Sequence, residues 1–205
     1  MTAPAQRVTA HRSGRRPGDS GTRTAILDAA RESFGASGYA GTTIRGVART
    51  AGVDPALVHR FFGSKESLFG ASLELPFDPA ELIPSILAGG ADGLGERLVR
   101  TFLGIWDATP GQGPMLALLR SAVADQAAAA SLRDFLTRAL FAPLAEAVGA
   151  DHPELRASLV GSQVIGLAVA RYVIRLPPLA CATPDELAPV LGRTIDAYLS
   201  GPLAA

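Results

Sequence analysis

The sequence predicts an all-α protein with a small N-terminal helical domain and a larger helical body. Three observations support this fold class. Residues 42–65 have the caps, glycine turn and apolar spacing of two short helices joined by a tight turn. Every segment after residue 79 has helical periodicity, and none alternates as a strand does. Pairs such as Gly89-Gly90 and Pro177-Pro178 then divide the body into separate helices.

The first 21 residues are rich in Pro, Gly, Ser and Thr and contain almost nothing apolar. Such a segment buries too little surface to offset its ordering entropy, so we expect a disordered basic arm over residues 1–21. It is either a solvated tail or an arm that reaches along a nucleic-acid groove. Its basic side chains are Arg7, Arg12, Arg15 and Arg16.

Residues 22–37 are expected to form the first helix. Ile26, Ala30 and Phe34 recur at four-residue steps, and Leu27 lies beside them. Gly38 ends the helix, and Tyr39 follows it. We interpret these apolar side chains as core residues that hold the next helices at a fixed angle.

Each helix boundary between residues 42 and 73 has a chemical signature. The first short helix follows threonine hydroxyls that can cap it, and it ends at Gly52. The second has an aspartate cap with proline at its first position, and it ends at Gly63. A serine caps a further helix that runs to about Leu73. The residues at these helix starts are Thr42, Thr43, Asp54, Pro55 and Ser64.

Prolines punctuate the passage from the N-terminal helices into the body, and they place a domain boundary near residues 70–78. We therefore divide the chain into the arm 1–21, a helix-turn-helix domain 22–73 and an all-helical domain 74–205. Pro143 should kink its helix or begin a new turn. The predicted body helices are 79–88, 94–108, 113–124, 127–148, 153–175 and 184–199.

The charges are unevenly distributed, although 19 basic and 19 acidic side chains cancel over the whole chain. Residues 1–70 hold ten basic and five acidic side chains, whereas residues 71–205 hold nine and fourteen. A basic head on an acidic body is typical of a module that meets phosphate through one end.

The sequence contains no pattern typical of an enzyme or of a metal or cofactor site. It has one cysteine, Cys181, and three scattered histidines without ligand spacing. No phosphate-binding glycine loop or Gly-x-Ser-x-Gly elbow is present. The charge-free run at 157–170 is too short to span a bilayer. We expect a cytoplasmic protein that is not an enzyme and needs no cofactor.

The stretch 42–65 resembles the DNA-binding signature of the TetR family of bacterial transcriptional regulators. The Thr42-Thr43 pair, the Gly52-Val53-Asp54 turn and the Ser64-Lys65 pair carry the resemblance. Asp54 replaces the serine that is usual in the family, and His59 replaces an aromatic residue. The resemblance implies a helix-turn-helix whose second helix lies in the major groove of operator DNA.

Carrying the family pattern onto this sequence assigns two sets of DNA contacts. Thr43, His59 and Lys65 match phosphate-contacting positions, although His59 could instead be a packing residue. The residues at the bases or their rim are Arg45, Pro55, Ala56, Leu57 and Arg60. Arg45 is the best candidate for guanine, and Ala56 and Leu57 suit contact with a thymine methyl group.

The helix predicted at 153–175 has a ridge of small residues at four-residue steps, which would let another helix approach closely. The resemblance implies that the last two long helices pair with their copies in a homodimer, whereas tight packing within one subunit is the alternative. The expected interface residues are Ser158, Ser162, Gly166, Ala170, Leu187, Leu191 and Ile195.

The resemblance further implies a pocket in the body for a small-molecule effector. Apolar candidates for its wall are Phe102, Trp106, Met115, Leu119 and Phe135, and polar candidates are Arg120, Gln163, Arg171 and Tyr172. For each of these residues a purely structural role in the core is the alternative.

Together these features predict a sequence-specific transcriptional regulator. We expect a repressor that binds a near-palindromic operator as a dimer and leaves the DNA when a small molecule binds. An activator remains open, because binding chemistry does not fix the direction of regulation. The rival interpretation is a DNA-binding architectural or interaction protein that has no effector.

Overall fold

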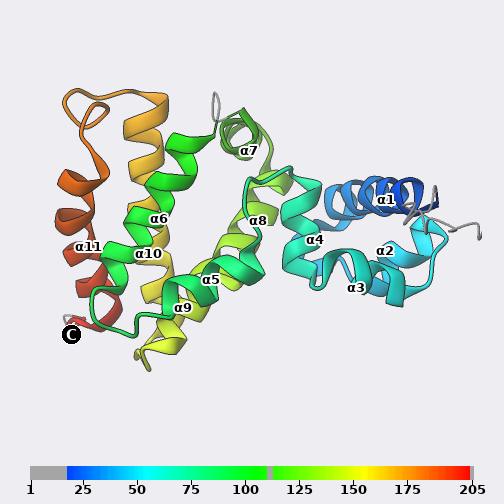
Figure 1. The fold of residues 1–205 in the computed structure, drawn as a ribbon, viewed down its shortest axis with the longest axis horizontal. Helices are drawn as coiled ribbons and strands as arrows, with labels where there is room; N and C mark the ends of the chain where they lie inside the picture. Colours follow the sequence, from blue (N-terminus) through cyan, green and yellow to red (C-terminus); the bar gives the residue numbers. More distant parts are fainter. Residues whose placement is uncertain (1–17, 110–112, 204–205) are drawn as a thin grey trace, which may run out of the picture.

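The computed structural model describes residues 18–109 and 113–203, and all regular elements in these ranges are helices. They form two groups that follow one another along the long axis, a head and a larger body (Figure 1). The predicted all-α fold is therefore confirmed. Residues 1–17 of the predicted arm lie outside the described residues, whereas residues 18–21 belong to the first helix.

Four helices form the head. The first begins at Gly18, earlier than predicted, and its backbone leaves the helical conformation at Gly38 (φ 68°), the residue predicted to end it, before a last turn to Gly41. The two short helices and the serine-capped helix begin at the predicted caps. The bounds are α1 (Gly18–Gly41), α2 (Ile44–Ala51), α3 (Pro55–Phe62) and α4 (Lys65–Ser72).

The body helices begin close to the predicted positions, and two of the predicted spans, 94–108 and 113–124, are reproduced. The predicted spans 127–148 and 153–175 are interrupted by π-helical turns, η2 (Leu136–Phe141) and η3 (Val169–Val173). The α-helices are α5 (Pro79–Leu87), α6 (Leu94–Ala108), α7 (Gly113–Ala124), α8 (Gln126–Phe135), α9 (Ala142–Ala147), α10 (Pro153–Ala168) and α11 (Pro184–Ser200).

Pro143 explains the first π-helical turn. It has no backbone N–H, and in a continuous α-helix its ring would clash with the carbonyl group four residues earlier. The chain widens into η2 directly before Pro143, which then lies in the first turn of α9. The predicted kink is thus realised as a π-helical turn followed by a new helix start.

A pair of glycines lets α6 and α11 pack at very short range. A Cβ atom added at Gly95 would overlap the Gly192 carbonyl oxygen, and one at Gly192 would lie 2.6 Å from the Glu96 Cα atom. The backbone N–H of Gly95 also donates to Asp196 Oδ1 at 2.7 Å. The two helices are thereby joined closely along the outer side of the body.

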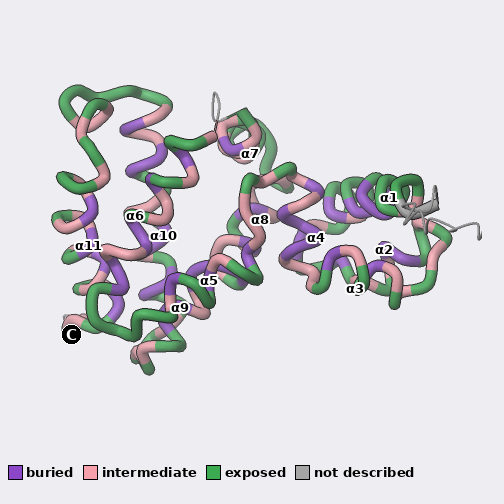
Figure 2. The backbone as a smooth tube through the Cα atoms, viewed as in Figure 1, coloured by how far each residue is buried: buried purple, intermediate pink, exposed green. Residues whose placement is uncertain are grey.

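One hydrophobic core runs from the head into the body, as the buried segments in Figure 2 show. The Tyr39 ring lies edge-on to Phe69 at 5.0 Å and to Phe135 of α8 at 5.6 Å between ring centres. The Tyr39 backbone N–H donates to Ser131 Oγ at 2.9 Å. The end of α1 is therefore packed against α8 of the body.

Two features are missing from the described ranges. No helix in residues 18–109 and 113–203 is both long and apolar enough to cross a membrane. In the same part of the chain, no three His, Cys, Asp or Glu side chains gather into a group that could hold a metal ion.

Candidate nucleic-acid interface and internal cavity

The start of α2 presents a capped helix end to solvent. Thr43 is the N-cap, and its Oγ1 accepts a hydrogen bond from the Gly46 N–H at 3.0 Å. Thr42 acts differently from the prediction, because its hydroxyl donates to the Gly38 carbonyl oxygen at 2.8 Å and so fastens the end of α1. Arg45 follows the cap and is exposed, whereas Val47 on the opposite face is fully buried.

The turn between α2 and α3 fixes the angle of the second helix. Gly52 has a φ of 67°, a left-handed conformation that glycine adopts without steric cost, and its N–H bonds the end of α2. Asp54 Oδ1 then accepts from the Ala56 N–H at 2.7 Å. Pro55 occupies the first turn of α3, where a backbone donor is not needed.

Helix α3 buries one face in the head and presents the other to solvent. Val58 and Phe62 are buried, so the helix cannot rotate without exposing apolar surface. Its predicted DNA-facing side chains divide by exposure: Pro55 and Leu57 are half-buried, and Ala56, His59 and Arg60 are exposed.

His59 is exposed near the C-terminal end of α3. Its Nδ1 lies 2.9 Å from the Gly63 carbonyl oxygen, so this nitrogen carries a proton. The other ring nitrogen can donate to a phosphate only when the ring is doubly protonated. A packing role for His59 does not fit its exposure.

The beginning of α4 connects the predicted phosphate contact to the core. The Lys65 ammonium lies 4.5 Å from the centre of the Tyr39 ring and donates to the Ala40 carbonyl oxygen at 3.5 Å. The Tyr39 hydroxyl donates to Glu66 Oε1 at 2.8 Å. Burial is the main cause that lowers the pKa of Lys65, and burial followed by the Glu66 hydrogen bond raises the pKa of Tyr39.

These contacts add Tyr39 and Glu66 to the candidate interface. The sequence analysis gave Tyr39 only a packing role and assigned no function to Glu66. Tyr39 lies between Lys65 on the surface and Phe135 in the body. The sequence signal was weak, since one tyrosine after a glycine does not reveal its partners.

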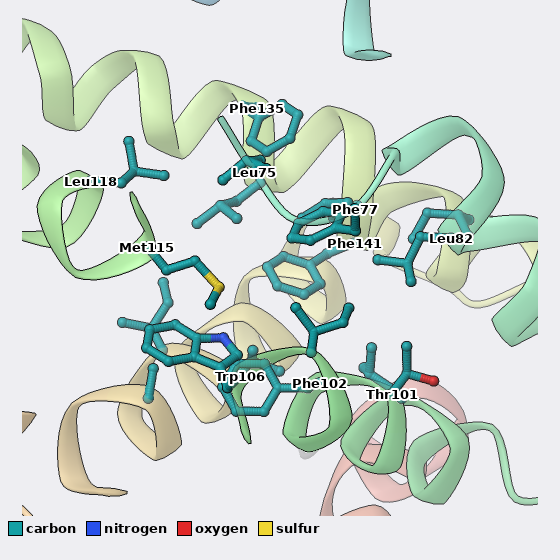
Figure 3. Close-up of a pocket in the computed structure, with 18 of the residues that line it drawn as sticks. Leu75, Phe77, Leu82, Thr101, Phe102, Trp106, Met115, Leu118, Phe135 and Phe141 are labelled. Atoms are coloured by element: carbon teal, nitrogen blue, oxygen red, sulfur yellow. The ribbon is translucent and has the colours of Figure 1, made fainter. Parts of the chain in front are cut away.

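A cavity of about 130 Å³ lies inside the body (Figure 3). All five apolar residues predicted for the pocket, Phe102, Trp106, Met115, Leu119 and Phe135, lie in its wall. Leu75 and Phe77, from the segment between α4 and α5, complete the side nearest the head. Sequence reasoning missed these two, because no helical periodicity links them to the body helices.

The four polar residues predicted for the pocket do not line this cavity. Arg171 is buried, and its guanidinium group donates to the carbonyl oxygens of Leu179 at 2.6 Å and Ala182 at 2.8 Å. The Tyr172 hydroxyl donates to Asp107 at 2.8 Å, and its ring stacks on Trp106. Arg120 and Tyr172 line a separate surface groove, and Gln163 lies half-buried on α10.

The predicted dimer residues lie on the two outer helices, α10 and α11. Ser158, Ser162 and Gly166 are exposed, and Ala170, Leu187 and Leu191 are half-buried. Leu155, Ile165 and Val190 add exposed apolar surface. Ile195 differs from the prediction: it is 1% exposed in the single subunit and belongs to its core, so it has no surface to offer a partner.

Arg156 fastens the same two helices to each other. Its buried guanidinium group pairs with Asp151 and donates to the carbonyl oxygens of Tyr198 at 2.6 Å and Gly201 at 2.9 Å. The start of α10 and the end of α11 are therefore held in one arrangement, which gives their outer faces a fixed geometry.

Comparison with known families decides the identity of this arrangement. Residues 26–71 match the family described as bacterial regulatory proteins, tetR family, and residues 92–199 match the tetracyclin repressor-like C-terminal domain. The second match alone covers more than half of the chain. The chain belongs to the TetR family. It is therefore a transcriptional regulator of that family rather than an enzyme, and the resemblance seen in the sequence is confirmed.

Individual relatives agree with this membership. The chain is similar to a TetR-family regulator of known structure from Streptomyces coelicolor, with 41% identity, a TM-score of 0.51, and coverage of 92% of this chain and 99% of that one. It is also 49% identical over 51 residues to the HTH-type transcriptional regulator BetI of Rhizobium meliloti. That second match covers 25% of this chain and 25% of BetI.

Proposed function

We propose that this regulator represses transcription by binding a near-palindromic operator as a homodimer and that a small molecule in the body cavity releases it. Residues 22–73 would bind DNA, and residues 74–205 would bind the effector and form the dimer. The observation that carries the proposal is the fixed presentation of α3. Its buried face is locked by Val58 and Phe62, and its outer face leaves Ala56, His59 and Arg60 accessible.

On the outer surface of the head, one set of residues is placed to contact DNA phosphates and another set to contact bases. Thr43 and Lys65 lie at the N-terminal ends of α2 and α4, where backbone N–H groups and the helix dipole favour an anion. Arg45 is exposed beside α3 and can reach a guanine edge in the major groove. We assign phosphate contacts to Thr43, His59 and Lys65 and base or rim contacts to Arg45, Pro55, Ala56, Leu57 and Arg60.

A single copy of this surface is too small for tight, specific binding, so the proposal includes a dimer. The exposed small residues Ser158, Ser162 and Gly166 of α10 would let the partner helix approach closely. Leu155 and Val190 would be covered by the partner, which removes exposed apolar surface from water. Two recognition helices would then face two half-sites of one operator.

The path from the cavity to the DNA-binding surface is short. Phe135 lines the cavity and contacts both Phe69 of α4 and Tyr39 of α1, at 4.7 Å and 5.6 Å between ring centres. Tyr39 in turn contacts Lys65 and Glu66 at the start of α4. A ligand that moves Phe135, Leu75 or Phe77 would shift the head relative to the body and separate the recognition helices.

Footprinting on the DNA upstream of the regulator's own gene tests this proposal. We expect protection of two half-sites on one face of the duplex about one helical turn apart or a multiple of it. The mass in solution, measured in parallel, should be that of a dimer. A strict monomer at micromolar concentration would count against the dimer. Protection that persists with every candidate ligand would count against release by an effector.

A further inference from the structure

The cavity wall has an unusual chemical composition for a site that must recognise one small molecule. Among the described residues, none that lines the cavity is Asp, Glu, Lys, Arg, His, Asn or Gln. Of the lining residues in 18–109 and 113–203, only Thr101 and Trp106 have a side-chain N–H or O–H group that can form a hydrogen bond. In Figure 3 the hydroxyl oxygen of Thr101 points away from Met115 and Trp106. A ligand held here contacts almost only carbon and sulfur.

The missing charges limit what can bind. An ionised carboxylate or ammonium group transferred from water into an apolar site needs a partner, and burial without one is strongly unfavourable. Arg171, a buried cation predicted for the pocket, is held by the carbonyl oxygens of Leu179 and Ala182 and does not line the cavity. The site therefore favours ligands without charge and selects against their ionised analogues.

The volume of the cavity and the aromatic side chains in its wall further limit the class of ligand. Its volume of about 130 Å³ is close to that of an engineered apolar cavity of about 150 Å³ in another protein that binds benzene or xenon. Four of the chain's eight phenylalanines and its single tryptophan line the wall. Aromatic faces and edges pack well against another ring, and the thioether of Met115 adapts to its shape.

We infer that the ligand of this cavity is a compact, uncharged aromatic hydrocarbon, a single ring with at most a short alkyl substituent. This inference rests on the proposed function only in treating the ligand as the effector, since binding to the cavity itself does not require DNA. Affinity comes from burial of the ring among Phe77, Phe102 and Phe141, and selectivity comes from a described wall that offers no partner for a charge.

The single tryptophan makes the test direct, because Trp106 lies in the cavity wall and reports occupancy by its fluorescence. Ethylbenzene and phenylacetate, which share a ring and differ in charge, would be titrated into the full chain at neutral pH. We expect a saturable change in emission with ethylbenzene and at least about a hundredfold weaker binding of phenylacetate, which corresponds to about 2.8 kcal/mol. Equal or tighter binding of phenylacetate would overturn the inference.

Two variants locate the site and test its polarity. Ala168→Leu fills the cavity from α10 and should weaken ethylbenzene binding at least tenfold, with helicity checked by circular dichroism. Leu136→Phe, at a lining position in η2, replaces it if Ala168→Leu does not fold. Thr101→Val removes the hydroxyl at nearly the same shape and should change affinity less than twofold. A tenfold loss in Thr101→Val would show that a polar anchor decides binding and would contradict the inference.

The same samples separate this inference from the proposed function. If the chain binds its operator but the emission of Trp106 does not respond saturably to ethylbenzene, the ligand class is wrong and the DNA-binding role stands. If ethylbenzene binds with the expected selectivity but the operator is neither bound nor released, the ligand class stands and the regulatory proposal fails.

Discussion

Replacing Phe135 by leucine tests whether the head and the body share one core. The side chain is 1% exposed, and its ring contacts Phe69 at 4.7 Å and Tyr39 at 5.6 Å. Leucine keeps most of the apolar volume but loses both aromatic contacts, each of which contributes about 0.5–1.5 kcal/mol. We therefore expect Phe135→Leu to lower the free energy of unfolding by about 1–3 kcal/mol.

The assay is urea unfolding followed by circular dichroism and by Trp106 fluorescence, at one fixed protein concentration because a dimer unfolds in a concentration-dependent way. Phe61→Leu is the matched control, since Phe61 is half-buried on α3 and its ring lies 6.4 Å from the Phe62 ring and 5.1 Å from the Arg60 guanidinium carbon, both on its own helix. The control should lose less than about 1 kcal/mol. Equal losses in both variants, or a loss below about 0.5 kcal/mol for Phe135→Leu, would refute a shared core.

Four further predictions concern DNA binding and stability. Lys65→Ala should weaken binding to operator and random DNA alike and lower the salt slope of the binding constant by about one. Arg45→Ala should instead cost about 1–3 kcal/mol on the operator and little on random DNA, measured by the same anisotropy titration. Arg156→Met leaves the Tyr198 and Gly201 carbonyl oxygens without their donor, so urea unfolding should show a loss of about 1–3 kcal/mol. Burial alone would raise the pKa of Glu66, but hydrogen bonds from its own backbone N–H, from Tyr39 and from Ser64 hold that pKa below its usual value. Because this pKa is depressed in the folded state, ionised Glu66 contributes to the free energy of unfolding above its unfolded pKa, and the contribution is lost as pH falls through the folded pKa. Glu66→Gln should therefore weaken the dependence of the free energy of unfolding on pH in this acidic range.

The sequence predicted the helices best where their ends are marked by capping or helix-breaking residues. The spans 94–108 and 113–124 agree with the structure because Gly93, Pro110 and Gly113 lie at or near their ends. The helix-turn-helix could be predicted equally well, because the capping hydrogen bonds of Thr43, Asp54 and Ser64 reach only two or three residues along the chain.

The parts that were not predicted depend on contacts between distant segments. The burial of Arg171 depends on the loop that carries Leu179 and Ala182, which helical periodicity does not place. Ile195 shares the periodicity of the outer residues of α11, yet the close approach of α6 at Gly95 and Gly192 turns it inward. Leu75 and Phe77 reach the cavity from the segment between α4 and α5, and their contacts there are with residues distant in the sequence.

The most direct test of the account is fluorescence anisotropy of the protein on DNA upstream of its own gene, beside a random duplex, at two salt concentrations. We predict that the upstream DNA binds at least about a thousandfold more tightly than random DNA, and that the preference persists at the higher salt concentration. Equal, weak and steeply salt-dependent binding to both duplexes would contradict operator recognition through α3 at this site.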